Sequence, residues 1–341
     1  MATTNRDSTL TPPYVLGFDI GGTKTALVLG TLDAQIARRA ELPTPVTEPF
    51  ERAFEMIGAF AQRFLGSCRA DGLPAPQAVG VAVGGPLDIE RGILFAPPHL
   101  KQWGQAPLKQ RLEEWFGLPV FVEHDGNAGA LAEFYFGAGR GVSNLIFLTM
   151  GTGLGAGIIV DGAIYHGSTD AAGEVGHIRL AEDGPVEYGK AGSWEAFCSG
   201  AGIVKLARWR YPEVWDPEVT TQQIVSHALA GDPPALELIE EVGRWLGKGL
   251  ALLVDVFNPD IIVLGTLGVV LGDLLLEPAR RIVQQEALPR SAAACRVVPA
   301  QLGSALGDVG CLAPALEAYR RGRLVFTACH SPRSRHSSNL A

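Results

Sequence analysis

The residues best suited to chemistry lie in the segment 121–127, whose sequence is Phe-Val-Glu-His-Asp-Gly-Asn. An apolar run leads into this segment and apolar residues at helical spacing follow it, which is typical of a buried strand that passes into a helix. Open α/β sheets place their chemistry at such junctions. The carboxylate of Asp125 can accept the proton of an alcohol, and a positioned general base increases a rate by about 10²–10⁴. The other interpretation is that Asp125 or Asn127 caps the helix, because both residue types favour that position.

Two glycine-rich segments each join a pair of apolar strands. Residues 19–24, Asp-Ile-Gly-Gly-Thr-Lys, have the pattern of a hairpin and not that of a Walker A loop, which opens a helix. Residues 151–157 also precede a strand, so they are not a dinucleotide-binding fingerprint. Backbone N–H groups of such hairpins can line a phosphate, and Asp19 is a candidate ligand for magnesium. The alternative is an ordinary hairpin in which Asp19 is a cap.

A second polar pair, Glu174 and His177, lies in a glycine-flanked segment. A Glu and a His three residues apart can share a metal when they project from one helix. Gly173 and Gly176 make a helix unfavourable here. We therefore expect these two side chains to face a small polar ligand.

The elements that must position these residues follow from hydrophobic periodicity. Strands are expected at 14–18, 25–29, 34–41, 79–83, 118–121, 144–149, 158–160, 261–264 and 296–298. Helices are expected at 50–65 (closed by Gly66), 108–116 (closed by Gly117), after Asn127, at 205–210, 221–230, 236–257, 274–288 and 306–320. Two units thus repeat one order of elements: a strand, a glycine hairpin, a second strand and then helices. Residues 1–13 and the Arg/Ser/His-rich segment from 321 onward are expected to be disordered.

Length and composition favour a two-domain globular protein. The chain has 341 residues, 47% of them hydrophobic and 19% charged, so it can bury a sizeable core. The net charge is −8 and no basic run precedes residue 320, so nucleic acid is not an expected partner. No run of about 18 apolar residues is present, so no membrane-spanning segment is expected.

Cysteine usage indicates a reducing compartment. The five cysteines are scattered, with no CxxC spacing, which argues against a disulfide framework and against a thiolate zinc site. Residues 1–11 are polar and lack the apolar core of a secretory signal. We therefore expect a cytoplasmic protein.

Five motifs in order resemble those of the ROK family, bacterial sugar kinases and sugar-responsive repressors of the actin-like ATPase superfamily. These motifs lie at 19–24, 121–127, 151–157, 173–177 and 258–265, and the resemblance extends over residues 14–320. It implies an α/β fold of two actin-like ATPase (ribonuclease H-like) domains with an active-site cleft between them. The expected boundaries are 14–122 for the N-terminal domain and 123–305 for the larger C-terminal domain, with the helix 306–320 packing back on the first.

The resemblance also implies an activity, the ATP-dependent phosphorylation of the 6-hydroxyl of a hexose, with glucose favoured. Asp125 matches the base that deprotonates the sugar hydroxyl, and Asp19 lies near a Mg²⁺ ion bound to the phosphates. The residues at sugar-binding positions are Gly85, His99, His124, Asp125, Glu174, His177 and Glu195. The residues at ATP-binding positions are Gly21, Gly22, Thr23, Lys24, Gly151, Thr152, Gly153 and Gly265. The resemblance further implies a homodimer.

This chain departs from the family pattern at several positions. His99 and His124 stand where the family usually has Asn, which leaves the identity of the hexose open. Val186, Tyr188 and Ser193 stand at the cysteine positions of the usual zinc motif. Three of the four zinc ligands are thus missing, and His177 alone cannot hold a structural zinc, so none is expected. We expect packing by aromatic residues to replace it.

Two other function classes are alternatives. The first is a sugar-sensing transcription regulator, and the second is a sugar-binding protein without turnover. Regulators of this kind carry a DNA-binding region of about 60–80 residues before the sugar domain, whereas about 13 residues precede Tyr14 here. Among kinases, fructose, mannose and N-acetylhexosamines are alternative substrates.

Overall fold

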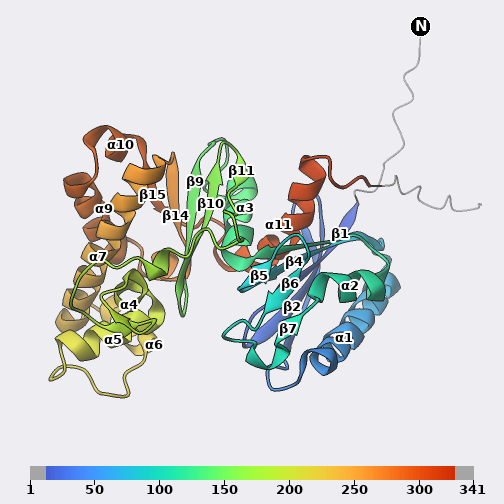
Figure 1. Cartoon of the computed structure of the whole chain (residues 1–341), viewed down its shortest axis with the longest axis horizontal. Coiled ribbons are helices and arrows are strands. Elements are labelled where there is room, and N and C mark those ends of the chain that lie inside the picture. The colour runs from blue at the N-terminus through green and yellow to red at the C-terminus, as the bar shows by residue number, and fades with distance from the viewer. Residues whose placement is uncertain (1–12, 327–341) are drawn as a thin grey trace, which may run out of the picture.

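The computed structural model describes residues 13–326, which form two five-stranded sheets (Figure 1). The first sheet has the order β3-β2-β1-β4-β8, with bounds β1 Tyr14–Ile20, β2 Lys24–Thr31, β3 Ile36–Pro43, β4 Pro76–Val83 and β8 Val120–His124. The second has the order β11-β10-β9-β14-β15, with bounds β9 Leu145–Met150, β10 Leu154–Val160, β11 Ala163–Ile164, β14 Ile261–Leu264 and β15 Arg296–Pro299. Two small sheets contain β5 (Leu87–Asp88), β6 (Ile93–Phe95) and β7 (Gln105–Ala106), and β12 (Val186–Glu187) and β13 (Lys190–Ala191).

Helices cover both sheets. The α-helices are α1 Phe50–Ala70, α2 Leu108–Phe116, α3 Asp125–Phe136, α4 Trp194–Cys198, α5 Gly200–Arg210, α6 Thr221–Leu229, α7 Pro233–Phe257, α8 Thr266–Leu271, α9 Asp273–Glu286, α10 Pro289–Ala294 and α11 Leu306–Arg320. Three 3₁₀ turns are η1 Lys101–Trp103, η2 Val175–His177 and η3 Gly303–Ala305. In the first sheet, β1 and β2 form an antiparallel hairpin, and β1 also pairs with β4 in parallel. In the second sheet, β9 and β10 form an antiparallel hairpin, and β9 also pairs with β14 in parallel.

The first sheet is covered on both faces, and its strands alternate accordingly. Leu16 and Phe18 of β1 pack in the core under α1 and α2, whereas Val15 packs against α11. Glycines let α11 approach closely, because a Cβ at Gly17 would lie 2.4 Å from Cys311 Sγ and one at Gly80 would lie 2.3 Å from the Cys311 carbonyl oxygen. The C-terminal helix therefore packs directly on the first sheet.

The second sheet has its large core on the side of α4 to α7 and α9. Its other side packs against α3, where the ring of Phe147 on β9 lies over Gly129. Helices α3 and α11 contact one another and lie between the two sheets (Figure 1). They are the packed link between the two halves of the molecule, while the domain boundaries stay a prediction.

Most predicted elements are confirmed, with shifts at their ends. Helix α2 ends at Gly117, whose φ of 63° is the left-handed cap that the sequence indicated. Helix α1 does not close at Gly66 but continues to Ala70, because its buried face continues through Cys68. A glycine within a helix costs only about 1 kcal/mol, which the burial of that face outweighs. Strand β3 begins at Ile36, after a turn in which Ala34 has a φ of 55°.

Two expectations about the ends of elements are wrong. Helix α3 begins at Asp125, two residues before Asn127, and its N-cap is His124 rather than Asp125 or Asn127. Residues 321–326 are described, and Leu324 is buried among residues of α11 and the first sheet, so the expectation of disorder is wrong for these six residues. The predictions for residues 1–12 and 327–341 lie outside the described residues. Within residues 13–326, no helix is both long enough and apolar enough to cross a bilayer.

Candidate active site

Asp125 lies where β8 ends and α3 begins. His124 caps the helix, with its Nδ1 accepting from the Gly126 N–H at 3.3 Å. Asp125 Oδ1 accepts from the same N–H at 2.7 Å and lies 3.0 Å from His124 Nδ1. The Asp125 side chain is 55% exposed, so the carboxylate is open to a ligand. Because a histidine occupies the capping position, the cap interpretation does not account for Asp125.

His99, His124 and Asp125 form one cluster, called here the base group. A Cβ at Gly85 would lie 2.9 Å from His124 Cδ2, and one at Gly22 would lie 2.8 Å from His99 Cβ. A side chain at Gly85 would thus collide with the His124 ring, and one at Gly22 would collide with the His99 side chain. Burial lowers the pKa of His99, with His124 acting in the same direction and the charge of Asp125 opposing it. The predicted residues Gly22, Gly85, His99, His124 and Asp125 therefore meet.

Glu174, His177 and Glu195 belong to a second polar group. Glu174 Oε2 lies 3.9 Å from His177 Nε2, and both side chains are about half exposed on the single 3₁₀ turn η2 and its N-cap. The His177 ring stacks on Tyr188 with a centroid separation of 3.5 Å. Glu195 Oε2 accepts from the Leu154 N–H at 2.7 Å and so lies against the second glycine hairpin.

Ala156 of β10 contacts both the turn that carries the base group and the turn that carries the second polar group. A Cβ at Gly126 would lie 3.1 Å from the Ala156 carbonyl oxygen, so the start of α3 packs on this strand. The Ala156 N–H donates to the Gly173 carbonyl at 2.8 Å, which holds the turn before Glu174 against the same strand. The second polar group nevertheless does not line the cavity next to Asp125.

That cavity, called here the base cavity, has a volume of about 250 Å³. Asp19 and Asp125 line it from the first sheet side, and Gly151 lines it from the second hairpin. Burial and the charges of Asp125 and Asp308 raise the pKa of Asp19 to about 6. A partly buried carboxylate beside two like charges favours the approach of a cation or of a proton.

A second cavity, called here the apolar cavity, has a volume of about 360 Å³ and adjoins the base cavity. The two share the residues Thr266, Leu306 and Gly307. The other residues of the apolar cavity are Val269, Val270, Ala300, Gly303 and Ser304. Sequence reasoning missed all of these lining residues. The one signal was the segment that begins at Gly265, because the α8 side chains follow directly from it.

The predicted phosphate hairpins differ in how they meet these cavities. In the first hairpin, the Gly21 N–H donates to the Lys24 carbonyl at 3.0 Å. This N–H is therefore already engaged, whereas we expected from the sequence that it would be free for a phosphate. Lys24 Nζ lies 3.3 Å from Glu41 and lines neither cavity, and the Thr23 carbonyl accepts from the Thr44 N–H.

In the second hairpin, Gly151 lines the base cavity. Thr152 follows it, and its carbonyl accepts from the Ala201 N–H at 3.2 Å. A Cβ at Gly153 would lie 2.8 Å from Glu195 Oε2. Gly265 donates to the Leu148 carbonyl at 2.9 Å and caps α8, next to the cavity residue Thr266. The second hairpin thus meets both the base cavity and the second polar group.

The loop of the usual zinc motif is occupied by other contacts. Ser193 caps α4, Val186 is exposed, and Tyr188 stacks on His177 as above. Cys198 is fully buried, which raises the pKa of its thiol well above the ordinary value and keeps it from a ligand. No group of three or more His, Cys, Asp or Glu residues in the described part of the chain has an arrangement that could hold a metal.

A hairpin-led α/β sheet in each half, with a carboxylate at a strand–helix junction between them, defines the class of actin-like ATPases. A profile of the ROK family matches residues 15–318, so the chain belongs to this family. The predicted family and fold class are both confirmed.

Known relatives include both enzymes and regulators. The chain is 34% identical to a glucokinase of Streptomyces coelicolor over 310 residues, covering 86% of this chain and 95% of the relative. It is 31% identical to a putative xylose repressor of Caldicellulosiruptor sp., covering 88% of this chain and 77% of the relative. Among solved structures, a Streptomyces griseus ROK glucokinase in complex with glucose and AMPPNP has a TM-score of 0.72 and 33% identity, covering 89% of this chain and 98% of that one.

Proposed function

We propose that the protein is an ATP-dependent sugar kinase that phosphorylates the 6-hydroxyl of a hexose, with glucose the favoured substrate. The observation that carries this proposal is the open carboxylate of Asp125 in a cavity that adjoins a second, apolar one. The similarity to glucokinases supports it. A homodimer and a cytoplasmic location stay predictions.

Asp125 is proposed as the general base. Its carboxylate projects from the first residue of α3, where the Gly126 N–H donates to it. There it accepts the proton of the sugar hydroxyl as that oxygen attacks the γ-phosphorus and the β–γ bridging oxygen leaves with ADP. Phosphoryl transfer depends mostly on positioning and charge neutralisation, and a carboxylate at a strand–helix junction contributes to the positioning.

The two cavities suit the two ends of ATP. The apolar cavity, with Val269 and Val270, is proposed to take the adenosine. The base cavity is proposed to take the phosphates beside Gly151, within reach of Asp125. Thr266 lies on the shared wall, where the ligand passes from one cavity to the other.

Asp19 fits a magnesium ion carried by the nucleotide. Its raised pKa reflects burial beside the carboxylates of Asp125 and Asp308, a charge imbalance that a divalent cation relieves. Oxygen ligands of this kind, completed by phosphate oxygens, are those that Mg²⁺ prefers. When bound, the ion would neutralise the charge that develops on the phosphates.

The sugar is proposed to lie between the base group and the second polar group. His124 approaches it from the end of β8 and His99 from the loop between β6 and η1, whereas Glu174 and His177 approach it from η2 and its N-cap. Glu195 would bind a hydroxyl from the side of the second hairpin. Because the turns that carry the two groups both pack on Ala156 of β10, the sugar is expected to draw the groups together.

The test is a coupled ADP-release assay with glucose, fructose, mannose and N-acetylglucosamine, comparing wild type with Asp125→Ala. We expect turnover with glucose and a loss of about 10²–10⁴ in kcat for the variant. Equal rates for the two proteins would exclude Asp125 as the base. Elemental analysis of the purified protein tests the zinc prediction, since one tightly bound zinc per chain would contradict it.

The similarity to a xylose repressor makes a regulator the second candidate. A regulator would bind sugar in calorimetry and show no ADP release with any hexose of the panel. Such a result would replace the proposed kinase function.

A further inference from the structure

Glu123 is a buried carboxylate directed at the turn that carries Asp125. Its residue is 6% exposed, and it lies on β8 two positions before Asp125. Its Oε1 accepts from the His124 backbone N–H at 3.0 Å and from Asn127 Nδ2 at 2.8 Å. One carboxylate oxygen thus holds both sides of the turn, the residue before Asp125 and the second residue after it.

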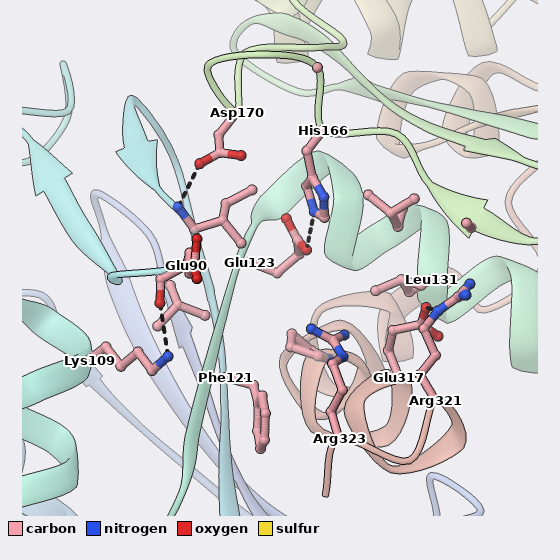
Figure 2. A pocket seen from close by; sticks show the side chains of 16 residues that line it. Glu90, Lys109, Phe121, Glu123, Leu131, His166, Asp170, Glu317, Arg321 and Arg323 are labelled. Atoms are coloured by element: carbon pink, nitrogen blue, oxygen red, sulfur yellow. Dashed lines mark hydrogen bonds and ion pairs between the residues drawn. The ribbon is translucent and has the colours of Figure 1, made fainter.

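The other oxygen of Glu123 reaches across to the second half of the chain. Oε2 lies 2.9 Å from Nε2 of His166, which follows β11 of the second sheet. Figure 2 shows the two side chains pointing toward one another at the edge of a cavity of about 670 Å³. In the same segment, Asp170 Oδ2 accepts from the Ile89 N–H at 2.9 Å (Figure 2). The segment after β11 therefore holds the first half at two points.

The contact with His166 provides a partner for the buried negative charge of Glu123. A buried carboxylate is costly unless it is hydrogen-bonded and paired. The groups that face His166 are Glu123 on β8, Asp170 in its own segment and Arg323 after α11. The hydrogen bond to Glu123 raises the pKa of His166, opposed by burial, so the imidazolium pairs with the carboxylate more readily than a free histidine would.

We propose that Glu123 and His166 are positioning residues for Asp125, and that through them the second half of the molecule sets the orientation of the proposed base. The inference rests on the proposed kinase function for its kinetic consequence. Neither residue touches the sugar in this proposal. Loss of His166 leaves Glu123 free to turn toward the cavity, which releases the His124 N–H and Asn127 and lets the Asp125 turn shift.

The kinetic test compares His166→Ala, His166→Gln and His227→Gln with wild type. Glutamine at 166 keeps an N–H donor for Glu123, and His227 forms a matched pair with Asp232 at 2.8 Å on an exposed surface. A misplacement on the order of 1 Å in a reacting group can cost about 10²-fold in rate. We expect His166→Ala to lower kcat by about 10- to 100-fold with the KM for glucose within about twofold, and His166→Gln to recover most of kcat. His227→Gln should match wild type.

A double variant tests the coupling. If His166 acts through Glu123, then Glu123→Gln combined with His166→Ala should lose no more kcat than the more impaired single variant, since the two act as a unit. Losses that multiply, a rise in KM with unchanged kcat, or full kcat in a folded His166→Ala protein would each overturn the proposal.

A structural measurement separates this inference from the proposed function. The Gly126 N–H donates to Asp125, so its amide resonance in ¹H–¹⁵N spectra reports the position of the proposed base. We expect His166→Ala to shift this resonance and His227→Gln to leave it in place. Inactive wild type with a shifted Gly126 resonance would refute the kinase but support the positioning network. An unshifted resonance would refute the network whatever the activity.

Discussion

At the scale of single residues, the capping of α3 by His124 has a direct chemical consequence. The carboxylate of an aspartate that capped the helix would accept hydrogen bonds from backbone N–H groups further along the first turn. Here His124 takes the capping position, and Asp125 keeps an exposed carboxylate oriented by the adjacent N–H. The histidine at this position thus adds a local role to its proposed contact with the sugar.

Asp19 predicts a specific dependence of stability on pH. Its pKa is raised from 3.8 to about 6, so between these values the native state binds more protons than the unfolded state. Stability contributed by Asp19 therefore falls as the pH rises through this window. We expect Asp19→Asn to melt at a higher temperature than wild type at pH 7.5 without Mg²⁺, and the difference to shrink toward pH 4. Thermal unfolding of both proteins across this range is the measurement, and a lower melting temperature for the variant at pH 7.5 would contradict it.

Tyr188 predicts an effect on sugar binding. Its ring stacks on His177, and burial together with a hydrogen bond to Glu195 raises the pKa of its hydroxyl. We expect Tyr188→Ala to raise the KM for glucose several-fold because His177 and Glu195 lose their orientation. Tyr188→Phe keeps the stacked ring and should show a smaller rise. Equal kinetics for the alanine variant and wild type would show that the ring does not position the second polar group.

At the scale of elements, β10 is the point where the two turns of the site meet. Gly173 has a φ of 96°, and a Cβ there would lie 2.0 Å from the Ala156 carbonyl oxygen. Gly141 has a φ of 86° with nothing within 4 Å of its Cβ position. Alanine substitutions at these two glycines therefore distinguish the cost of the left-handed backbone, which both share, from the cost of a steric clash, which only Gly173 has.

We expect Gly141→Ala to cost on the order of 1–2 kcal/mol of unfolding free energy, which is the cost of the left-handed conformation alone. Gly173→Ala should cost more, because the turn must also move away from Ala156, and it should raise the KM for the hexose by displacing Glu174. Urea denaturation and steady-state kinetics check the two effects. Equal losses of stability would show that the turn moves away from β10 without cost.

At the scale of the whole molecule, α3 and α11 link two halves that carry different parts of the site (Figure 1). Asp125 lines the base cavity, whereas the second polar group does not. Closing two lobes over a substrate excludes water that would otherwise accept the phosphoryl group. The described arrangement therefore suits a kinase that closes on its sugar.

We expect glucose together with AMPPNP to lower the radius of gyration measured by small-angle X-ray scattering. Asp125→Asn should contract in the same way, because the variant removes the base and keeps the walls of both cavities. An unchanged radius at saturating ligand would exclude closure as the step that unites the two polar groups.

Much of the site could be predicted from short segments of sequence. The β1–β2 and β9–β10 hairpins and the junction at 121–127 depend on local periodicity, and the end of α2 depends on the left-handed conformation of Gly117. Neighbouring residues determine these features. The partner of the Gly21 N–H in the first hairpin could not be predicted in this way. The hydrogen bond from the Gly21 N–H to the Lys24 carbonyl closes the turn, and a glycine pair alone does not reveal this partner.

The sequence alone determined the family, the hairpin-led order of each half and the candidate base, because motifs and periodicity are properties of consecutive residues. Tertiary structure decided how distant segments combine. The return of α11 to the first sheet brings Gly307 and Asp308 to Asp19, and the fold places His166 against Glu123. Such contacts join residues that are 43 to 289 positions apart, so the burial and charge that they create arise only when the chain is folded.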